Sequence, residues 1–183
     1  MLLDRLGLAA ALIGLLLAAV AVRAAEPEPA GYRGEPYRAP VPDTLQGAVV
    51  IGDETARALW WSGRVAFVDV LPRPERPEGL PEGTLWRDAP HPSIPGALWL
   101  PNTGYADLAD QTMDYFEAGL AAASGGALDA PLVFFCKRDC WMSWNAAKRA
   151  IAAGYTRVYW YPQGAEGWAD SGWELKETQP FGQ

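Results

Sequence analysis

Cys136 and Cys140 are the residues of this chain whose type and spacing could do chemistry, and they are its only cysteines. Cys136 directly follows the apolar run 132–135, and Cys140 lies four residues later. In one helical turn the Cα atoms of residues four apart lie about 6 Å from each other, within the range that a disulfide accepts. Because a bridge across so short a loop adds little stability, Cys140 has two possible roles: a structural staple or a resolving thiol.

The neighbours of Cys136 favour a reactive thiol over an inert buried one. Lys137 and Arg138 add positive charge beside it, and the loop amides and the N-terminus of the next helix would face its sulfur. These features should lower the pKa of Cys136 below the value of about 8.5 of a free thiol. We expect Cys136 to be the more acidic and more accessible thiol of the pair. The predicted catalytic residues are Cys136 and Cys140, and the predicted binding residues are Lys137, Arg138, Asp139, Trp141 and Ser143.

Composition excludes several other kinds of site. The chain has a single histidine, His91, so a four-ligand zinc site of Cys and His cannot be assembled, and the C-x-x-C-H motif of a c-type haem is absent. The formal net charge is −7, and no stripe of Lys and Arg is present, so nucleic acid is not an expected partner. We expect no metal and no cofactor, and we assign no role to His91.

Apolar runs and turn residues predict the elements that position the cysteines. Strands alternate with helices, which predicts an α/β fold: a mostly parallel central sheet of about five strands flanked by helices. Ligands of such a sheet bind beyond the carboxyl ends of its strands, where Cys136 lies. The predicted strands are 48–51, 65–70, 97–100, 132–135 and 157–161, and the predicted helices are 54–61 with Asp53 as N-cap, 106–123, 142–153 and 166–171.

The ends of the chain differ in composition from its centre. The wholly apolar run 6–22 ends at Val22, and Val22-Arg23-Ala24 supplies the small residues that suit a signal peptidase. We predict a cleaved signal peptide and a periplasmic protein that meets the membrane only before cleavage; the alternative is an uncleaved anchor. The long Pro-rich stretch 72–92 predicts an excursion from the sheet. The predicted organisation is 1–24 signal peptide, 25–47 Pro-rich extended lead-in, laid over the domain or disordered, 48–175 domain and 176–183 tail.

Residues 131–168 resemble the C-terminal half of a rhodanese domain: strand, Cys loop, helix, A-A-G-Y, strand, turn and Trp. Upstream, the segment 93–97 (SIPGA) resembles the H-I-P-G-A element of rhodaneses, and 68–70 (VDV) resembles their D-V-R strand end. The order and spacing of these motifs imply a rhodanese-like fold over residues 48–173.

A narrower resemblance concerns the Cys loop and the lead-in. The C-x-x-x-C-W sequence that begins at Cys136, with the segment 37–42 (YRAPVP), is similar to small secreted Cys-Trp-motif (CXXCW) proteins associated with PQQ-dependent alcohol catabolism. This resemblance implies a periplasmic quinoprotein dehydrogenase or cytochrome c as partner. A rhodanese-like thiol site implies a small sulfur or thiol substrate.

Departures from the rhodanese pattern leave two functions open. Ser143 lies seven residues after Cys136 instead of six, Trp141 and Met142 stand where an Arg is common, and Ser93 replaces a His. The first function is a thiol enzyme, either a sulfurtransferase that forms a Cys136 persulfide or a dithiol oxidoreductase. The second is a non-catalytic accessory protein that binds or helps to mature a quinoprotein dehydrogenase or its cytochrome partner. A Cys-based phosphatase is disfavoured because no Arg closes the loop.

Overall fold

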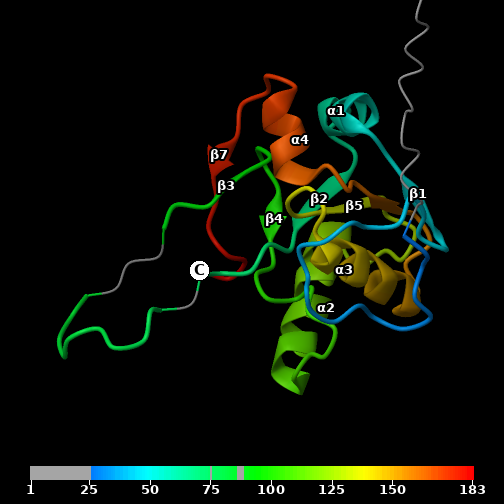
Figure 1. Ribbon diagram of the computed structural model, residues 1–183. Coiled ribbons are helices and arrows are strands. Elements are labelled where there is room, and N and C mark those ends of the chain that lie inside the picture. The colour runs from blue at the N-terminus through cyan, green and yellow to red at the C-terminus, as the bar shows by residue number, and fades with distance from the viewer. Residues whose placement is uncertain (1–25, 75, 86–88) are drawn as a thin grey trace, which may run out of the picture.

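A computed structural model describes residues 26–74, 76–85 and 89–183. Its centre is a five-stranded parallel sheet with strand order β1-β6-β5-β2-β4 (Figure 1). The α/β fold with a parallel central sheet is therefore confirmed. The predicted signal peptide lies outside the described residues, among which no helix is long and apolar enough to cross a membrane. The strands are β1 (Ala48–Val50), β2 (Ala66–Asp69), β4 (Leu98–Trp99), β5 (Leu132–Phe135) and β6 (Val158–Trp160).

Helices cover both faces of the sheet, which explains why its central strand β5 is apolar throughout. Every residue of β5 is buried, as expected for a parallel strand packed on two sides. Phe134 belongs to the core beneath α2 and α3, whereas Phe135 belongs to the core beneath α1 and α4, and Figure 1 shows these helix pairs on opposite sides of the sheet. The helices are α1 (Asp53–Trp61), α2 (Asp110–Ser124), α3 (Trp141–Ala152) and α4 (Gly164–Asp170).

Two local predictions about helix starts were wrong. Gly52, not Asp53, is the N-cap of α1, and Asp53 instead accepts a hydrogen bond of 2.6 Å from the Tyr161 hydroxyl. Burial and this carboxylate raise the pKa of Tyr161. The helix predicted over 106–123 begins at Asp110.

The late start of α2 has a tertiary cause. The buried Arg149 guanidinium of α3 donates hydrogen bonds to the carbonyl oxygens of Thr103, Tyr105 and Ala106. Carbonyls that accept from a distant side chain are satisfied without helical partners. Contacts with α3 therefore keep the segment before α2 out of the helix. The helix propensity of that segment gives no sign of these contacts.

A second, antiparallel sheet was not predicted. It pairs β3 (Pro92–Ser93) with β7 (Lys176–Glu177). Strands this short show no alternation of apolar and polar residues, so their pattern carries no signal. The pairing joins the end of the 72–92 excursion to the C-terminal segment, and Figure 1 shows the described part of the excursion extending away from the central sheet.

The Pro-rich lead-in is ordered and lies across α3, and we call its residues 26–46 the strap. The backbone N–H of Arg33 donates to the Asn145 side-chain oxygen at 2.9 Å, and the Asn145 amide donates back to the Arg33 carbonyl at 2.9 Å. The Trp144 indole donates to the Thr44 carbonyl at 3.2 Å. Of the two alternatives for the lead-in, the extended segment laid over the domain is therefore the one observed.

Asn145→Ala should detach the middle of the strap. The buried Asn145 side chain also donates to the Gly104 carbonyl, so the substitution leaves several backbone groups without a partner, and we expect the free energy of unfolding to fall by about 2 kcal/mol. Urea denaturation measures this loss, and hydrogen exchange at the Arg33 amide reports the detachment. Gln111→Ala, at an exposed position of α2, is the matched control and should change stability by less than about 0.5 kcal/mol. Equal loss in the two variants would contradict the role of Asn145.

Candidate functional site

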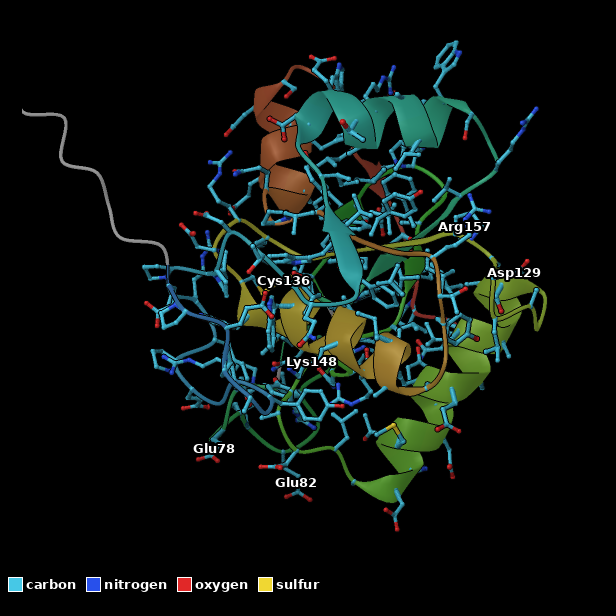
Figure 2. All side chains as sticks on the ribbon, turned by 90° about the vertical axis from the view of Figure 1, so that its right-hand side faces the viewer. Glu78, Glu82, Asp129, Cys136, Lys148 and Arg157 are labelled. Atoms are coloured by element: carbon cyan, nitrogen blue, oxygen red, sulfur yellow. A yellow bond between two sulfur atoms is a disulfide. The ribbon has the colours of Figure 1, made fainter. Side chains whose placement is uncertain are left out.

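Cys136 lies at the carboxyl edge of the central sheet, where the sequence predicted it. It directly follows β5, and its carbonyl accepts a hydrogen bond of 2.9 Å from the backbone N–H of Ala165 in α4. Its side chain forms a disulfide with Cys140 across a Cα–Cα distance of 6.4 Å. Figure 2 shows Cys136 near the start of α3. The two cysteines therefore form one site, at the edge where parallel α/β sheets bind ligands.

The strap covers this cysteine loop. The backbone of Arg38 pairs with that of Cys140 in an isolated antiparallel β-bridge. The backbone N–H of Ala39 donates to the Asp139 carbonyl at 3.0 Å. Cys136 is 1% exposed and Cys140 is 6% exposed. In the disulfide form Cys136 is therefore slightly less exposed than Cys140, and the greater accessibility of the reduced Cys136 thiol stays a prediction.

The two sulfurs have different electrostatic surroundings. Cys140 is the N-cap residue of the 12-residue helix α3, and its side chain makes no capping hydrogen bond to the helix. The Cys136 sulfur instead lies 3.7 Å from the Lys137 carbonyl oxygen and 3.6 Å from the Cys140 carbonyl oxygen. Both cysteines are in the disulfide, so the greater acidity of the Cys136 thiol stays a prediction.

Arg138 is held by α4 instead of pointing freely at the cysteines. Its guanidinium donates to the Gln163 side-chain oxygen at 2.8 Å and to Asp170 at 2.7 Å, and the hydrogen bond with Asp170 raises the pKa of Arg138. The backbone N–H of Arg138 donates to Glu166, which also accepts two hydrogen bonds from Arg38 of the strap. Glu166 therefore ties the strap to the cysteine loop.

The other predicted binding residues lie in three different places: a turn, the core and the wall of a cavity. Asp139 adopts the left-handed region with φ 52°. Trp141 and Ser143 are buried in the core, where the Trp141 indole donates to the Pro40 carbonyl at 3.0 Å and Ser143 accepts from the Trp160 indole at 3.0 Å. Lys137 lines a cavity.

This cavity lies at the base of the 72–92 excursion and has a volume of about 250 Å³. Its wall is largely apolar and is formed by Leu71 and several prolines, with Lys137 and His91 as polar members. Lys137 directly follows Cys136, so the cavity borders the cysteine loop, while neither cysteine is among its lining residues. We call it the Lys137 cavity.

Sequence reasoning missed His91. Its Nε2 lies 2.8 Å from an Asp69 oxygen that also accepts the Ser93 hydroxyl at 2.5 Å, and all three side chains are buried. Asp69, the last residue of β2, therefore acts as a buried hydrogen-bond acceptor at a strand end. The signal that could have indicated His91 was its position two residues before Ser93 in the family motif. Within the described ranges, no three His, Cys, Asp or Glu side chains come together in a way that could hold a metal ion.

The chain belongs to the rhodanese-like domain family, whose family model matches residues 53–171. Among solved structures, human single-domain sulfurtransferase TSTD1 is 25% identical, with 67% of this chain and 96% of that chain covered and a TM-score of 0.41. The polysulfide-sulfur transferase homodimer from Wolinella succinogenes is 17% identical, with coverages of 75% and 84% and a TM-score of 0.44. A protein from Saccharomyces cerevisiae is 18% identical, with coverages of 68% and 93% and a TM-score of 0.44. No curated protein sequence matches the chain.

Proposed function

We propose that this protein is a thiol enzyme that uses Cys136 and Cys140 as one reactive pair for sulfur transfer and dithiol–disulfide cycling. The observation that carries the proposal is their disulfide at the carboxyl edge of β5, with Cys140 at the N-cap of α3. A bridge across so short a loop contributes little to stability, which supports a chemical role for it. Membership of the rhodanese-like family supports sulfur as the group that is transferred.

The reaction begins with the reduced pair and a donor R–S–SH. The Cys136 thiolate attacks the outer sulfur of the donor, the bond between that sulfur and R–S breaks, and R–S⁻ leaves, so that Cys136 carries a persulfide. The Cys140 thiolate then attacks the Cys136 sulfur, the outer sulfur leaves as HS⁻, and the disulfide forms. The pair has given two electrons to the transferred sulfur. Two external thiols return the disulfide to the dithiol and become a disulfide themselves.

The setting that we propose is the periplasm, after removal of residues 1–24. Disulfides persist in that compartment, which agrees with an oxidised Cys136–Cys140 pair. The resemblance to the secreted Cys-Trp-motif proteins supports a partner from PQQ-dependent alcohol oxidation, namely a quinoprotein dehydrogenase or a cytochrome c.

A second candidate function is a non-catalytic accessory protein that binds or helps to mature such a dehydrogenase or cytochrome. The observation that favours the accessory function is that the site is closed. Both cysteines are buried, and the backbone of the strap pairs with that of Cys140. In this alternative the disulfide fixes the loop under the strap, and the partner contacts the outer surface.

The mass of the protein purified from its native host tests compartment and cysteine state together. We expect loss of residues 1–24, no alkylation before reduction, and alkylation of both cysteines after reduction. An intact N-terminus contradicts the cleaved signal. Two freely alkylated thiols in the protein as isolated contradict a pair that rests as a disulfide. If both thiols of the folded protein stay unreactive after reduction, whereas the unfolded chain is fully alkylated, the accessory function is supported.

A further inference from the structure

His91 is held in one orientation by a buried carboxylate. Asp69 accepts hydrogen bonds from His91 and Ser93 on one oxygen and from the Leu71 backbone N–H on the other at 2.9 Å. The imidazole also stacks on Trp99, with ring centroids 3.8 Å apart. Because the carboxylate only accepts, Nε2 is the nitrogen that carries the hydrogen in the neutral ring, and Nδ1 keeps its lone pair.

The lone pair of Nδ1 is available. Among the described residues, Nδ1 has no hydrogen-bond partner, and it is not one of the fully buried polar atoms without a partner. His91 lines the Lys137 cavity together with Lys137, the residue that follows Cys136. A carboxylate that orients a histidine, with the second ring nitrogen free to accept a proton, is the arrangement of a general base.

We propose that His91 is the general base for a small acidic thiol that binds in the Lys137 cavity and attacks the Cys136–Cys140 disulfide; this inference rests on the proposed thiol chemistry. The apolar wall of Leu71, Pro72 and Pro90 suits a short carbon chain. Lys137 is the cation of the cavity wall, so it selects a carboxylate on the thiol. The ligand class is therefore a small thiol that carries an acidic group.

The step is a thiol–disulfide exchange that begins with a proton transfer to His91. His91 Nδ1 accepts the proton of the substrate thiol R–SH, and the positive imidazolium is stabilised by Asp69. The thiolate R–S⁻ forms a bond to the Cys136 sulfur, and the bond between the two cysteine sulfurs breaks. Cys140 leaves as a thiolate at the N-terminus of α3, where a negative sulfur is favoured. The product is a mixed disulfide between Cys136 and the substrate.

The first experiment measures how fast 3-mercaptopropionate opens the disulfide at pH 7, by acid quench, alkylation and mass. Each rate is divided by that of the urea-unfolded protein with the same thiol. We expect His91→Gln to slow opening by about 100-fold, the lower end of the range for a general base. Gln111→Ala, at an exposed position of α2 outside this cavity, is the control; its rate should stay within about twofold of wild type.

Two further readouts separate a base from a structural residue. In His91→Ala, added imidazole should restore opening, whereas pyrrole of similar shape should not. Raising the pH from 7 to about 9.5 increases the share of the thiol that is deprotonated without a base, so the difference between His91→Gln and wild type should shrink. The charged groups that border His91 are Asp69 and Lys137 in its own site and Arg73 and Glu177 in the adjoining cavity. The pH stays below the range in which lysine and arginine lose their protons.

The acidic part of the ligand is tested by comparing 3-mercaptopropionate with cysteamine. We expect the normalised rate to favour the carboxylate thiol by about tenfold in wild type, and Lys137→Gln to abolish the preference. A wild-type disulfide that opens no faster than the unfolded one, with either thiol, overturns the proposed function itself. If wild type opens fast and His91→Gln opens equally fast, only the role of His91 as a base is overturned. The same holds if pyrrole restores opening in His91→Ala as well as imidazole does. Equal normalised rates for the two thiols in wild type overturn the proposal that the ligand carries an acidic group.

Discussion

Cys136→Ser should abolish every sulfur-transfer and thiol–disulfide activity of this protein, whereas Cys140→Ser should abolish only the dithiol cycle. Cys136 forms the bond to the transferred sulfur in each proposed reaction, so without it the rate should fall by at least about 10³-fold. Cys140 is needed only to expel that sulfur as HS⁻ and close the bridge. In Cys140→Ser the persulfide should therefore persist on Cys136 and pass to an added acceptor.

Glutathione persulfide as donor makes the two variants distinguishable. Wild type should release sulfide and end as the disulfide, which is read by a sulfide assay and by alkylation. Cys140→Ser should gain the mass of one sulfur atom and convert cyanide to thiocyanate without releasing sulfide. Cys136→Ser should do neither.

The same two variants decide between the proposed functions in the cell. If growth on the alcohol substrate is as fast with both variants as with wild type, the thiol-enzyme proposal is wrong and the accessory protein remains. Loss of growth with Cys136→Ser alone supports sulfur transfer, and loss with either variant supports the dithiol cycle. Matched protein levels, measured in the same cells, exclude a folding defect as the cause.

Gly164→Ala should be the most damaging single substitution of a small residue around the site. Gly164 has φ +56°, and an added Cβ would lie 2.8 Å from the carbonyl carbon of Cys136, with still closer contact to its oxygen. Backbone strain and overpacking together should lower the free energy of unfolding by about 3 kcal/mol. The loss falls on the backbone that carries Cys136, so the cysteine loop should shift as well.

Gly172→Ala is the matched control for this substitution. Gly172 has φ +80° with no heavy atom within 4 Å of an added Cβ, so only the backbone strain of about 1 kcal/mol is expected. Urea denaturation of both variants gives the difference. Equal midpoints would show that the close approach of α4 to Cys136 does not constrain the loop.

The strap and the helix α4 together explain why the cysteine loop is closed. Glu166 of α4 joins Arg38 of the strap to the Arg138 backbone, and the Ala165 N–H holds the Cys136 carbonyl. The loop is therefore fixed from two sides by segments that precede and follow it in the sequence. The Lys137 cavity adjoins this loop at the base of the 72–92 excursion, which makes it the approach to the sulfurs that we favour.

The amino-acid sequence by itself determined the frame of the protein. Five apolar runs bounded by Pro, Gly and polar residues predicted the five parallel strands, because a strand packed on both faces must be apolar along its length. The run 132–135 ends at Cys136, so the position of the sulfur at the sheet edge followed from the same pattern. Motif order predicted the rhodanese-like family, and the family match confirms it.

Tertiary structure decided what surrounds the sulfurs. His91 meets Asp69 across 22 residues, and Arg38 meets Cys140 across about 100 residues; neither pair leaves a local pattern, since periodicity reports only which face of an element is buried. The strap lies over the loop because Asn145 and Trp144 of α3 present hydrogen-bonding groups to its backbone. Cys140 is the N-cap residue of α3 because the helix begins at Trp141. These features depend on contacts between segments that are distant in the sequence, and such contacts form only when the whole chain folds.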